Sequence, residues 1–410
     1  MATHIWRGDA PAVAQVDTVQ ITGYDAATTY IIMINGKTVS VPGTTDANGT
    51  ATALAAAWNA STIPEFEEIT ASASTDTVTL TADTAGVPFT AVSSVSGGGG
   101  TIGAVTNATA NAGPNVWAAN NFDSGALPAN GDTVIVENSS SEILYGLDQS
   151  AVTLAVLTIR QSFTGKIGLP RSNANGYVEY RETFLAISAT TINVGEGEGN
   201  GSGRIKLDTG ANQAALNVHN KATRAETGIA CLLWKGTHAD NTLNVIKGDV
   251  GVAFFGGETA TVATLKVGYL SNQSGDSSVV CGSGTTLTTV EVRGGQVELN
   301  SNVTTITQTG GSVNLRGSAT VTTWNLDGGI AYYCSSGTAT LINVGGGGVL
   351  DFRRDMQART VANLNAYQGA AIHDPFKTVT WTNGLDLHRC SPSEVTLNIG
   401  QHQTLTPSAI

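Results

Sequence analysis

A triplet of apolar, polar and apolar residues recurs between residues 157 and 399, and it constrains the fold more than any other feature. Its copies are Leu157-Thr158-Ile159, Ile192-Asn193-Val194, Leu216-Asn217-Val218, Leu243-Asn244-Val245, Leu265-Lys266-Val267, Val290-Glu291-Val292, Ile306-Thr307-Gln308, Trp324-Asn325-Leu326, Ile342-Asn343-Val344, Leu364-Asn365-Ala366 and Leu397-Asn398-Ile399. Only Gln308 breaks the pattern. Successive copies lie 16 to 35 residues apart. A constant short strand between turns of variable length is typical of a parallel β-helix, because insertions at the corners leave the stacked strands in register.

Glycines mark the corners of these turns. Between Gly294 and Gly348 a glycine pair closes each triplet, and a second short strand follows it, over 296–299, 312–315, 330–333 and 349–352. Glycine adopts positive φ angles without a Cβ clash, so the backbone can turn sharply there. We therefore expect a mainly β fold in which residues 115–372 form a right-handed parallel β-helix, a solenoid with two or three faces per turn.

Asparagine fills the middle of the triplet in seven of the eleven copies. Side chains alternate between the two faces of a strand, so a residue between two inward apolar residues points outward. Stacked outward asparagines can hydrogen-bond to one another along the stacking axis. We predict such a structural ladder from Asn193, Asn217, Asn244, Asn325, Asn343, Asn365 and Asn398. A role as ligand or sugar contacts is the weaker alternative.

Residues 1–96 have the pattern of a small α+β domain. Alternating apolar residues flank Asn35-Gly36, which is typical of a β-hairpin turn. An alanine-rich segment predicts a helix that begins at a Thr50 N-cap and ends near Asn59, and a second hairpin is expected over residues 69–81.

Two further segments complete the predicted organisation. Residues 97–114 are rich in Gly, Ala and Thr, and we interpret them as a linker. The triplet spacing breaks down over residues 373–410, which we interpret as a C-terminal cap or an intersubunit segment.

The first domain resembles a small module found in virion proteins of tailed bacteriophages. The resemblance covers residues 16–92 and rests on Ile34-Asn35-Gly36-Lys37 in a hairpin, Ala-Leu-Ala-Ala-Ala-Trp-Asn over 53–59, and Val-Thr-Leu-Thr-Ala-Asp-Thr-Ala-Gly-Val-Pro-Phe-Thr over 78–90. In addition, residues 120–136 resemble the segment that opens many β-helical surface proteins. The resemblance to the phage module implies a place in a virus particle without saying which place.

Charge and motifs exclude several classes of function. The 410 residues include 20 Lys and Arg against 32 Asp and Glu, a net charge of -12. Proteins that bind nucleic acid need clustered basic residues to displace counterions, so we expect no nucleic-acid partner. We also predict no signal peptide and no membrane span, because no apolar run approaches the roughly 18 residues that a span needs. No metal or cofactor is expected, because the six histidines lack metal spacing and no HExxH, GxSxG or P-loop motif occurs.

The most site-like cluster is the segment 351–355, with Tyr332, Tyr333 and Trp324 in the preceding turn. Enzymes that hydrolyse polysaccharides use two carboxyl groups roughly 5 to 10 Å apart, and Asp351 and Asp355 are the candidate pair. The neighbouring Arg353 and Arg354 favour a surface network of salt bridges instead. We therefore predict no catalytic residues.

Together these features predict a non-enzymatic structural protein of a tailed-bacteriophage virion, assembled in the bacterial cytoplasm. A capsid decoration or stabilising protein is the preferred form. The expected partners are major capsid or tail proteins and further copies of this chain, with a trimer favoured, because the ends and flanks of a solenoid need to be covered. Two alternatives stay open: a tail fibre or tailspike adhesin that binds host glycans, and a polysaccharide depolymerase.

Overall fold

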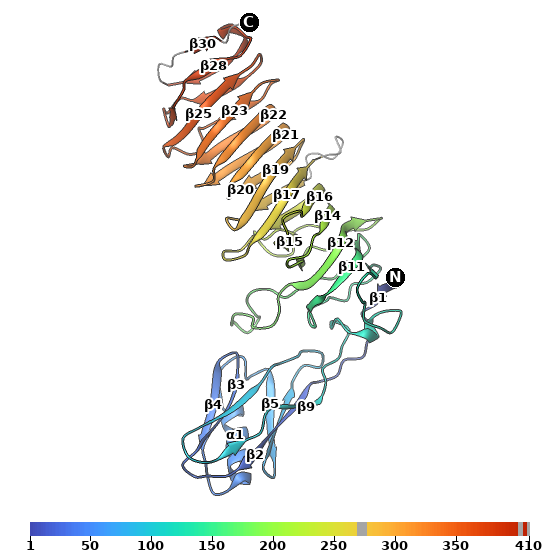
Figure 1. Cartoon of the computed structure of the whole chain (residues 1–410). Coiled ribbons are helices and arrows are strands. Elements are labelled where there is room, and N and C mark those ends of the chain that lie inside the picture. Colours follow the sequence, from blue (N-terminus) through green and yellow to red (C-terminus); the bar gives the residue numbers. More distant parts are fainter. Residues whose placement is uncertain (269–276, 401–404, 408–410) are drawn as a thin grey trace.

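A computed structural model of the chain describes residues 1–268, 277–400 and 405–407. The fold is mainly β, and the described residues contain one α-helix, α1 (Ala47–Asn59). Antiparallel strands form a small domain near one end, and parallel strands stack into a long body (Figure 1). The predicted mainly β fold is therefore confirmed.

The small domain contains two antiparallel sheets that pack with α1. Its strands are β2 (Val16–Gly23), β3 (Thr29–Ile34), β4 (Lys37–Pro42), β5 (Ile69–Ser74), β6 (Thr77–Ala82), β7 (Val92–Ser96), β8 (Thr101–Ile102) and β9 (Thr106–Thr109). One sheet has the order β5-β6-β2-β8 with β9 also on β2, and the other has the order β4-β3-β7. Tyr30, Leu54 and Trp58 are fully buried in the core that the helix and the sheets share.

Both predicted hairpins are present, but the helix begins earlier than expected. Asn35 and Gly36 have positive φ angles and join β3 to β4. The side chain of Asp46 accepts a hydrogen bond of 2.7 Å from the backbone N–H of Gly49, so Asp46 is the N-cap. Thr50 lies inside the helix, where its hydroxyl donates to the Asp46 carbonyl. The prediction that Thr50 caps the helix was wrong because two polar residues with capping ability lie close together.

The predicted boundaries of the small domain are also corrected. The strand β1 (Thr3–Trp6) belongs to the body, where it pairs in parallel with β10 (Thr133–Val136). Residues 97–114 are not a free linker, since β8 and β9 lie within them and pair with β2. The small domain is thus inserted between the first two strands of the body. The sequence does not indicate this arrangement, because β1 has only four residues and its partner β10 lies far from it along the chain.

The strands of the body from residue 148 onward are β11 (Asp148–Arg160), β12 (Leu185–Glu196), β13 (Ile205–Asp208), β14 (Ala215–His219), β15 (Leu232–Lys235), β16 (Thr242–Val252), β17 (Ala260–Val267), β18 (Ser277–Cys281), β19 (Thr285–Val292), β20 (Gln296–Leu299), β21 (Val303–Gly317), β22 (Val321–Ser335), β23 (Thr338–Val344), β24 (Val349–Asp351), β25 (Arg359–Ala366), β26 (Ala371–Asp374), β27 (Val379–Trp381), β28 (Leu385–Leu387), β29 (Thr396–Ile399) and β30 (Leu405–Pro407). Pairings between these strands are parallel, and many join strands that are two apart in the sequence.

The triplets lie in one column of paired strands. Their first residues lie opposite one another in the order Leu157, Ile192, Leu216, Leu243, Leu265, Val290, Ile306, Trp324, Ile342 and Leu364. The column continues to Leu385 on β28, opposite Leu364. Ten of the eleven copies are in register, so the segments of variable length between them leave this column of paired strands unbroken.

The middle positions of this column carry most of the predicted asparagine ladder. Asn217 donates to Asn193 at 3.1 Å, Asn343 donates to Asn325 at 2.7 Å, and Asn365 donates to Asn343 at 2.8 Å. Asn244 lies opposite Asn217 in the same column. Charged and hydroxyl side chains on β17, β19 and β21 separate the two groups of asparagines.

Asn398 is not part of this ladder. It lies on β29, which pairs with β26, and its partner in register is His373. The residue opposite Asn365 is Asp386. The prediction for Asn398 was wrong because strands of different faces share the same apolar, polar, apolar pattern. Residues 371–399 continue the parallel pairing rather than closing it, whereas residues 401–404 and 408–410 of the predicted cap lie outside the described residues.

The body encloses one continuous apolar core that extends from Trp6 to Leu387. Gln308, the exception in the triplet pattern, points into this core and is fully buried. Its Oε1 accepts a hydrogen bond from Trp324 Nε1 at 3.3 Å, and its Nε2 donates to the Ile330 carbonyl at 3.1 Å. The amide is tolerated because the core supplies these partners.

Candidate functional site

The aromatic residues near Asp351 divide between the core and the surface. Trp324 and Tyr333 are fully buried and contact each other with ring centres 6.3 Å apart. They are core residues and cannot serve as platforms for a sugar. Tyr332 is half-buried on the outer face of β22, in register with Asp351 on β24.

Asp351 forms a two-pronged ion pair with Arg353. Its carboxylate accepts hydrogen bonds from Nε and Nη2 of Arg353 at 2.9 and 2.7 Å, and from the Arg353 backbone N–H at 2.8 Å. Burial raises the pKa of Asp351, but the hydrogen bonds and the charge of Arg353 outweigh burial and hold the pKa below its usual value. A carboxyl group in this environment stays ionised and is a poor proton donor.

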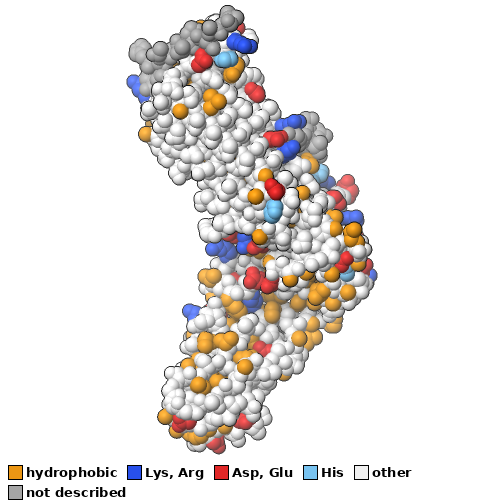
Figure 2. Space-filling view, viewed as in Figure 1, with side chains coloured by type: hydrophobic (Ala, Val, Ile, Leu, Met, Phe, Trp, Pro, Cys, Tyr) orange, Lys and Arg blue, Asp and Glu red, His pale blue; other side chains and the backbone are white. Residues whose placement is uncertain are grey.

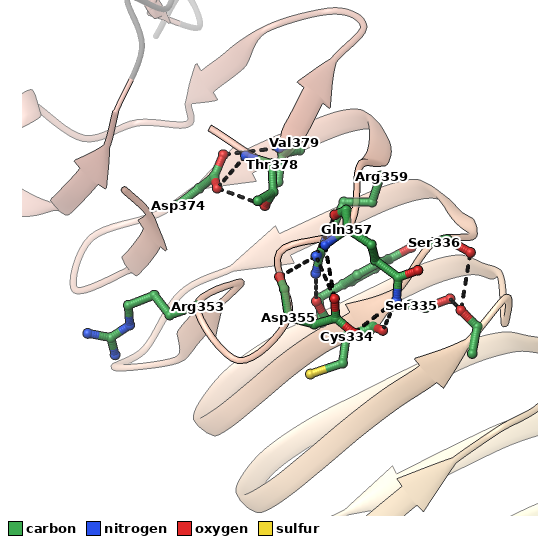
Figure 3. A network of polar contacts seen from close by, with 12 residues as sticks. Cys334, Ser335, Ser336, Arg353, Asp355, Gln357, Arg359, Asp374, Thr378 and Val379 are labelled. Carbon is green, nitrogen blue, oxygen red and sulfur yellow. Dashed lines mark hydrogen bonds and ion pairs between the residues drawn. The ribbon is translucent and has the colours of Figure 1, made fainter. Parts of the chain in front are cut away.

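Asp355 belongs to a different network, centred on the buried side chain of Arg359 (Figure 3). The Arg359 guanidinium donates to the backbone carbonyls of Tyr333, Asp355 and Gln357, and its Nη2 lies 3.9 Å from Asp355 Oδ1. The Asp355 carboxylate also accepts from the Gln357 backbone N–H at 2.9 Å. These contacts hold the loop after β24 against β22, so the role of Asp355 is structural.

The two acids therefore serve two separate structural networks. Replacing both with asparagine, Asp351→Asn and Asp355→Asn, is expected to lower the free energy of unfolding by about 1 kcal/mol at neutral pH, as for other partly exposed ion pairs. Because the pKa of Asp351 is lower in the folded state, its contribution exists above the ordinary carboxyl pKa and is lost as the pH falls. Chemical denaturation at pH 7 and at pH 3 measures both effects. A cleavage activity on host polysaccharide that the double variant lost would contradict this interpretation.

A polar groove of about 280 Å³ lies on the outer face of four neighbouring parallel strands, β18, β20, β21 and β22. Its lining includes Gln296, Glu298, Ser312, Asn314, Tyr332 and Arg354, with Arg224 at the other end. We call this feature the polar groove. Val280, Glu298, Asn314 and Tyr332 lie opposite one another on successive strands, so the parallel register places them in one row.

No protein-family model, curated protein or solved structure matches this chain. In the part of the chain that the structure describes, no group of three or more His, Cys, Asp or Glu side chains is placed to hold a metal ion. No helix in the described ranges has the length and apolar character that crossing a membrane requires.

The sequence predicted residues at one end of the polar groove but not those along its length. Tyr332 and Arg354 stood out because they lie near Asp351. The outward positions of the second strands, Gln296, Glu298, Ser312 and Asn314, alternate with inward apolar residues and could have been found from that alternation. Arg224 gave no such signal, since it lies between β14 and β15 and reaches the groove only through the fold.

Charge around the polar groove is largely balanced by ion pairs. Arg224 Nε lies 2.6 Å from Asp249 Oδ2, and Arg316 Nη1 lies 3.0 Å from Glu298 Oε2. Arg354 differs, since its Cζ lies 3.2 Å from the centre of the Tyr332 ring. The groove thus combines neutral hydrogen-bonding side chains with a cation that rests on an aromatic ring.

Proposed function

We propose that the body is a right-handed parallel β-helix and that the protein is a non-enzymatic structural component of a tailed-phage virion, on the capsid exterior as a decoration or stabilising protein. The observation that carries this proposal is the unbroken register of the triplet column. In a solenoid each turn contacts only its neighbours, and a continuous core makes the stack a stiff rod. A rod of this kind suits a spacer or a stabilising element.

The small domain supports a role in attachment. It is inserted after β1, so both of its chain connections lead into the first strands of the body. The body then extends away from it (Figure 1). The resemblance of residues 16–92 to a module of tailed-phage virion proteins supports a particle as the place of attachment. One end would bind the particle while the rod projects from it.

The visible face of the body supports a projecting role. Figure 2 shows mostly uncharged polar side chains and backbone over this face of the upper body, with scattered charged side chains. Strands that face water on one side remain well solvated when their outward positions are polar. Hydrophobic side chains gather nearer to the small domain in the same view, which favours that end as the place of contact with partners.

The copy number in purified particles tests the proposed location. Quantitative mass spectrometry against the major capsid protein is expected to give very many copies per particle, in a fixed ratio to that protein. A decoration protein follows the repeats of the shell, whereas a fibre is present in a few multiples of its own symmetry. Only a few copies per particle would contradict the capsid proposal and would favour a tail fibre or tailspike.

We further propose that the protein forms a homo-oligomer, with a trimer favoured, because the flanks of a solenoid present strand edges and corners to other chains. Light scattering of the purified chain at micromolar concentration is expected to give a mass near three times 41.9 kDa. A monodisperse monomer would contradict this part of the proposal.

A second candidate function is an adhesin that binds host glycans, and the polar groove favours it. Glycan sites present hydroxyl and amide side chains along an elongated surface, and the groove does so across four strands. The depolymerase alternative receives less support, since Asp351 and Asp355 are bound in separate ion pairs.

A further inference from the structure

The polar groove contains a cation that the protein does not neutralise. Arg354 is exposed and lies over the ring of Tyr332. Arg224, Arg316 and Arg353 each have a carboxylate partner, whereas Arg354 forms no ion pair with any residue in the described part of the chain. The groove therefore has a local positive charge, although the whole chain carries a net charge of -12.

The position of Arg354 on Tyr332 prepares it for a planar anion. A guanidinium that rests on an aromatic face keeps its N–H donors free at its edge, and two of them can bind a carboxylate in parallel. Contact with the ring also restricts the arginine side chain before the ligand arrives. Less conformational entropy is then lost on binding than with a mobile surface cation.

The rest of the groove fits the hydroxyl groups of a linear ligand. Gln296, Ser312 and Asn314 present amide and hydroxyl groups next to Arg354. The side chain of Asn314 is half-buried, and its Oδ1 atom has no hydrogen-bond partner among the described residues, so this amide keeps unused hydrogen-bonding capacity. Strands are roughly 4.8 Å apart, so β18 to β22 span about 14 Å. That length accommodates a short segment of an extended polymer.

We propose that the polar groove binds a linear polysaccharide that carries carboxylate groups, with one carboxylate on Arg354 and sugar hydroxyls on Gln296, Ser312 and Asn314. The proposal rests on the adhesin candidate, since it names the class of glycan that this candidate would bind. It is independent of the stiffness and the copy number of the rod, so its failure would leave those conclusions unaffected.

Isothermal titration calorimetry of the full chain tests the proposal with two probes, a hexamer of galacturonic acid and the same hexamer with its carboxyl groups methyl-esterified. The acidic hexamer is expected to bind, and esterification is expected to weaken binding about tenfold, since a charge-assisted hydrogen bond is lost. Arg354→Gln is expected to cause a similar loss. Arg354→Lys keeps the charge but not the planar donors. Its affinity for the acidic hexamer is expected to lie between that of the parent chain and that of Arg354→Gln.

The matched control is Lys37→Gln, which removes one positive charge from the exposed hairpin of the small domain and is expected to leave the affinity unchanged. Equal affinity for both hexamers would overturn the proposal, as would an Arg354→Gln variant that binds like Lys37→Gln or a chain that binds neither probe at millimolar concentration. Competition by inorganic phosphate at the same concentration of anionic groups would show a site for simple anions and would overturn the polysaccharide assignment.

Discussion

Replacing Trp324 with alanine is expected to lower the free energy of unfolding by about 3 to 5 kcal/mol. The Trp324 side chain is fully buried in the middle of the body, in the triplet column and in contact with Tyr333. The substitution leaves a cavity and also removes the indole N–H that satisfies Gln308 Oε1. The loss therefore combines a packing effect with a buried acceptor that has lost its donor.

Urea denaturation followed by circular dichroism measures this effect, with two comparison variants. Trp324→Phe keeps most of the volume but not the N–H, so its loss is expected to be smaller than that of Trp324→Ala. Thr322→Ala changes an exposed residue two positions away and is expected to shift the free energy by less than about 0.5 kcal/mol. If Trp324→Ala and Thr322→Ala had equal effects, Trp324 could not lie in the core.

The second large effect is expected at the contact between the small domain and the body. Arg181 is on a loop between β11 and β12, and its Nη2 atom lies 2.6 Å from Oε2 of Glu68 in the small domain. Its Nε atom donates a hydrogen bond of 2.7 Å to the backbone carbonyl of Pro88. Glu179 is also within 3.3 Å of Arg181, and its side chain is 1% exposed. Arg181→Ala would leave Glu179 as a buried carboxylate without an ion-pair partner, although it keeps hydrogen bonds from Asn173 and from the backbone N–H of residue 181. Removing one partner of a buried ion pair typically costs about 3 to 5 kcal/mol.

The expected consequence is a flexible joint between two intact parts. Small-angle X-ray scattering of Arg181→Ala is expected to show a broader distribution of interatomic distances than the parent chain. Protease is expected to cut more rapidly in the two connections between the small domain and the body, which lie between β1 and β2 and between β9 and β10. Arg171→Ala is the matched control, because Arg171 lies on the same loop but contacts Phe255 of the body. Identical scattering from the two variants would show that Arg181 does not fix the joint.

The register of the body could be predicted from the sequence because its cause is local. Each triplet places two apolar residues inward and one polar residue outward, and this rule depends only on the strand itself. The Asn343 contacts with Asn325 and Asn365 follow from the same rule. Asn398 shows the limit of the triplet rule. The pattern identifies a strand, but it does not identify the column of paired strands to which that strand belongs.

The errors in the domain boundaries have a different cause. The pairing of β1 with β10 and of β9 with β2 joins segments that are far apart in the sequence. Short strands of this kind carry little hydrophobic pattern of their own, so their partners decide their structure. A threonine-rich strand such as Thr106–Thr109 is indistinguishable from a linker by composition alone.

The candidate site was predicted only at its most visible residues. Proximity in sequence suggested that Asp351 and Asp355 form a pair, but the fold gives them separate arginine partners. The polar groove is built from one to three residues on each of four strands, together with Arg224 and Arg354 from loops. Such a site becomes visible only when the register of the strands is known.

Electron cryomicroscopy of intact particles tests the central proposal most directly, because it shows both the shape and the location of the protein. The expected result is an elongated rod on the capsid exterior, repeated with the shell, with a strand spacing of about 4.8 Å along its axis and the small domain at its attached end. A capsid surface without such rods, or rods confined to the tail, would contradict the proposal.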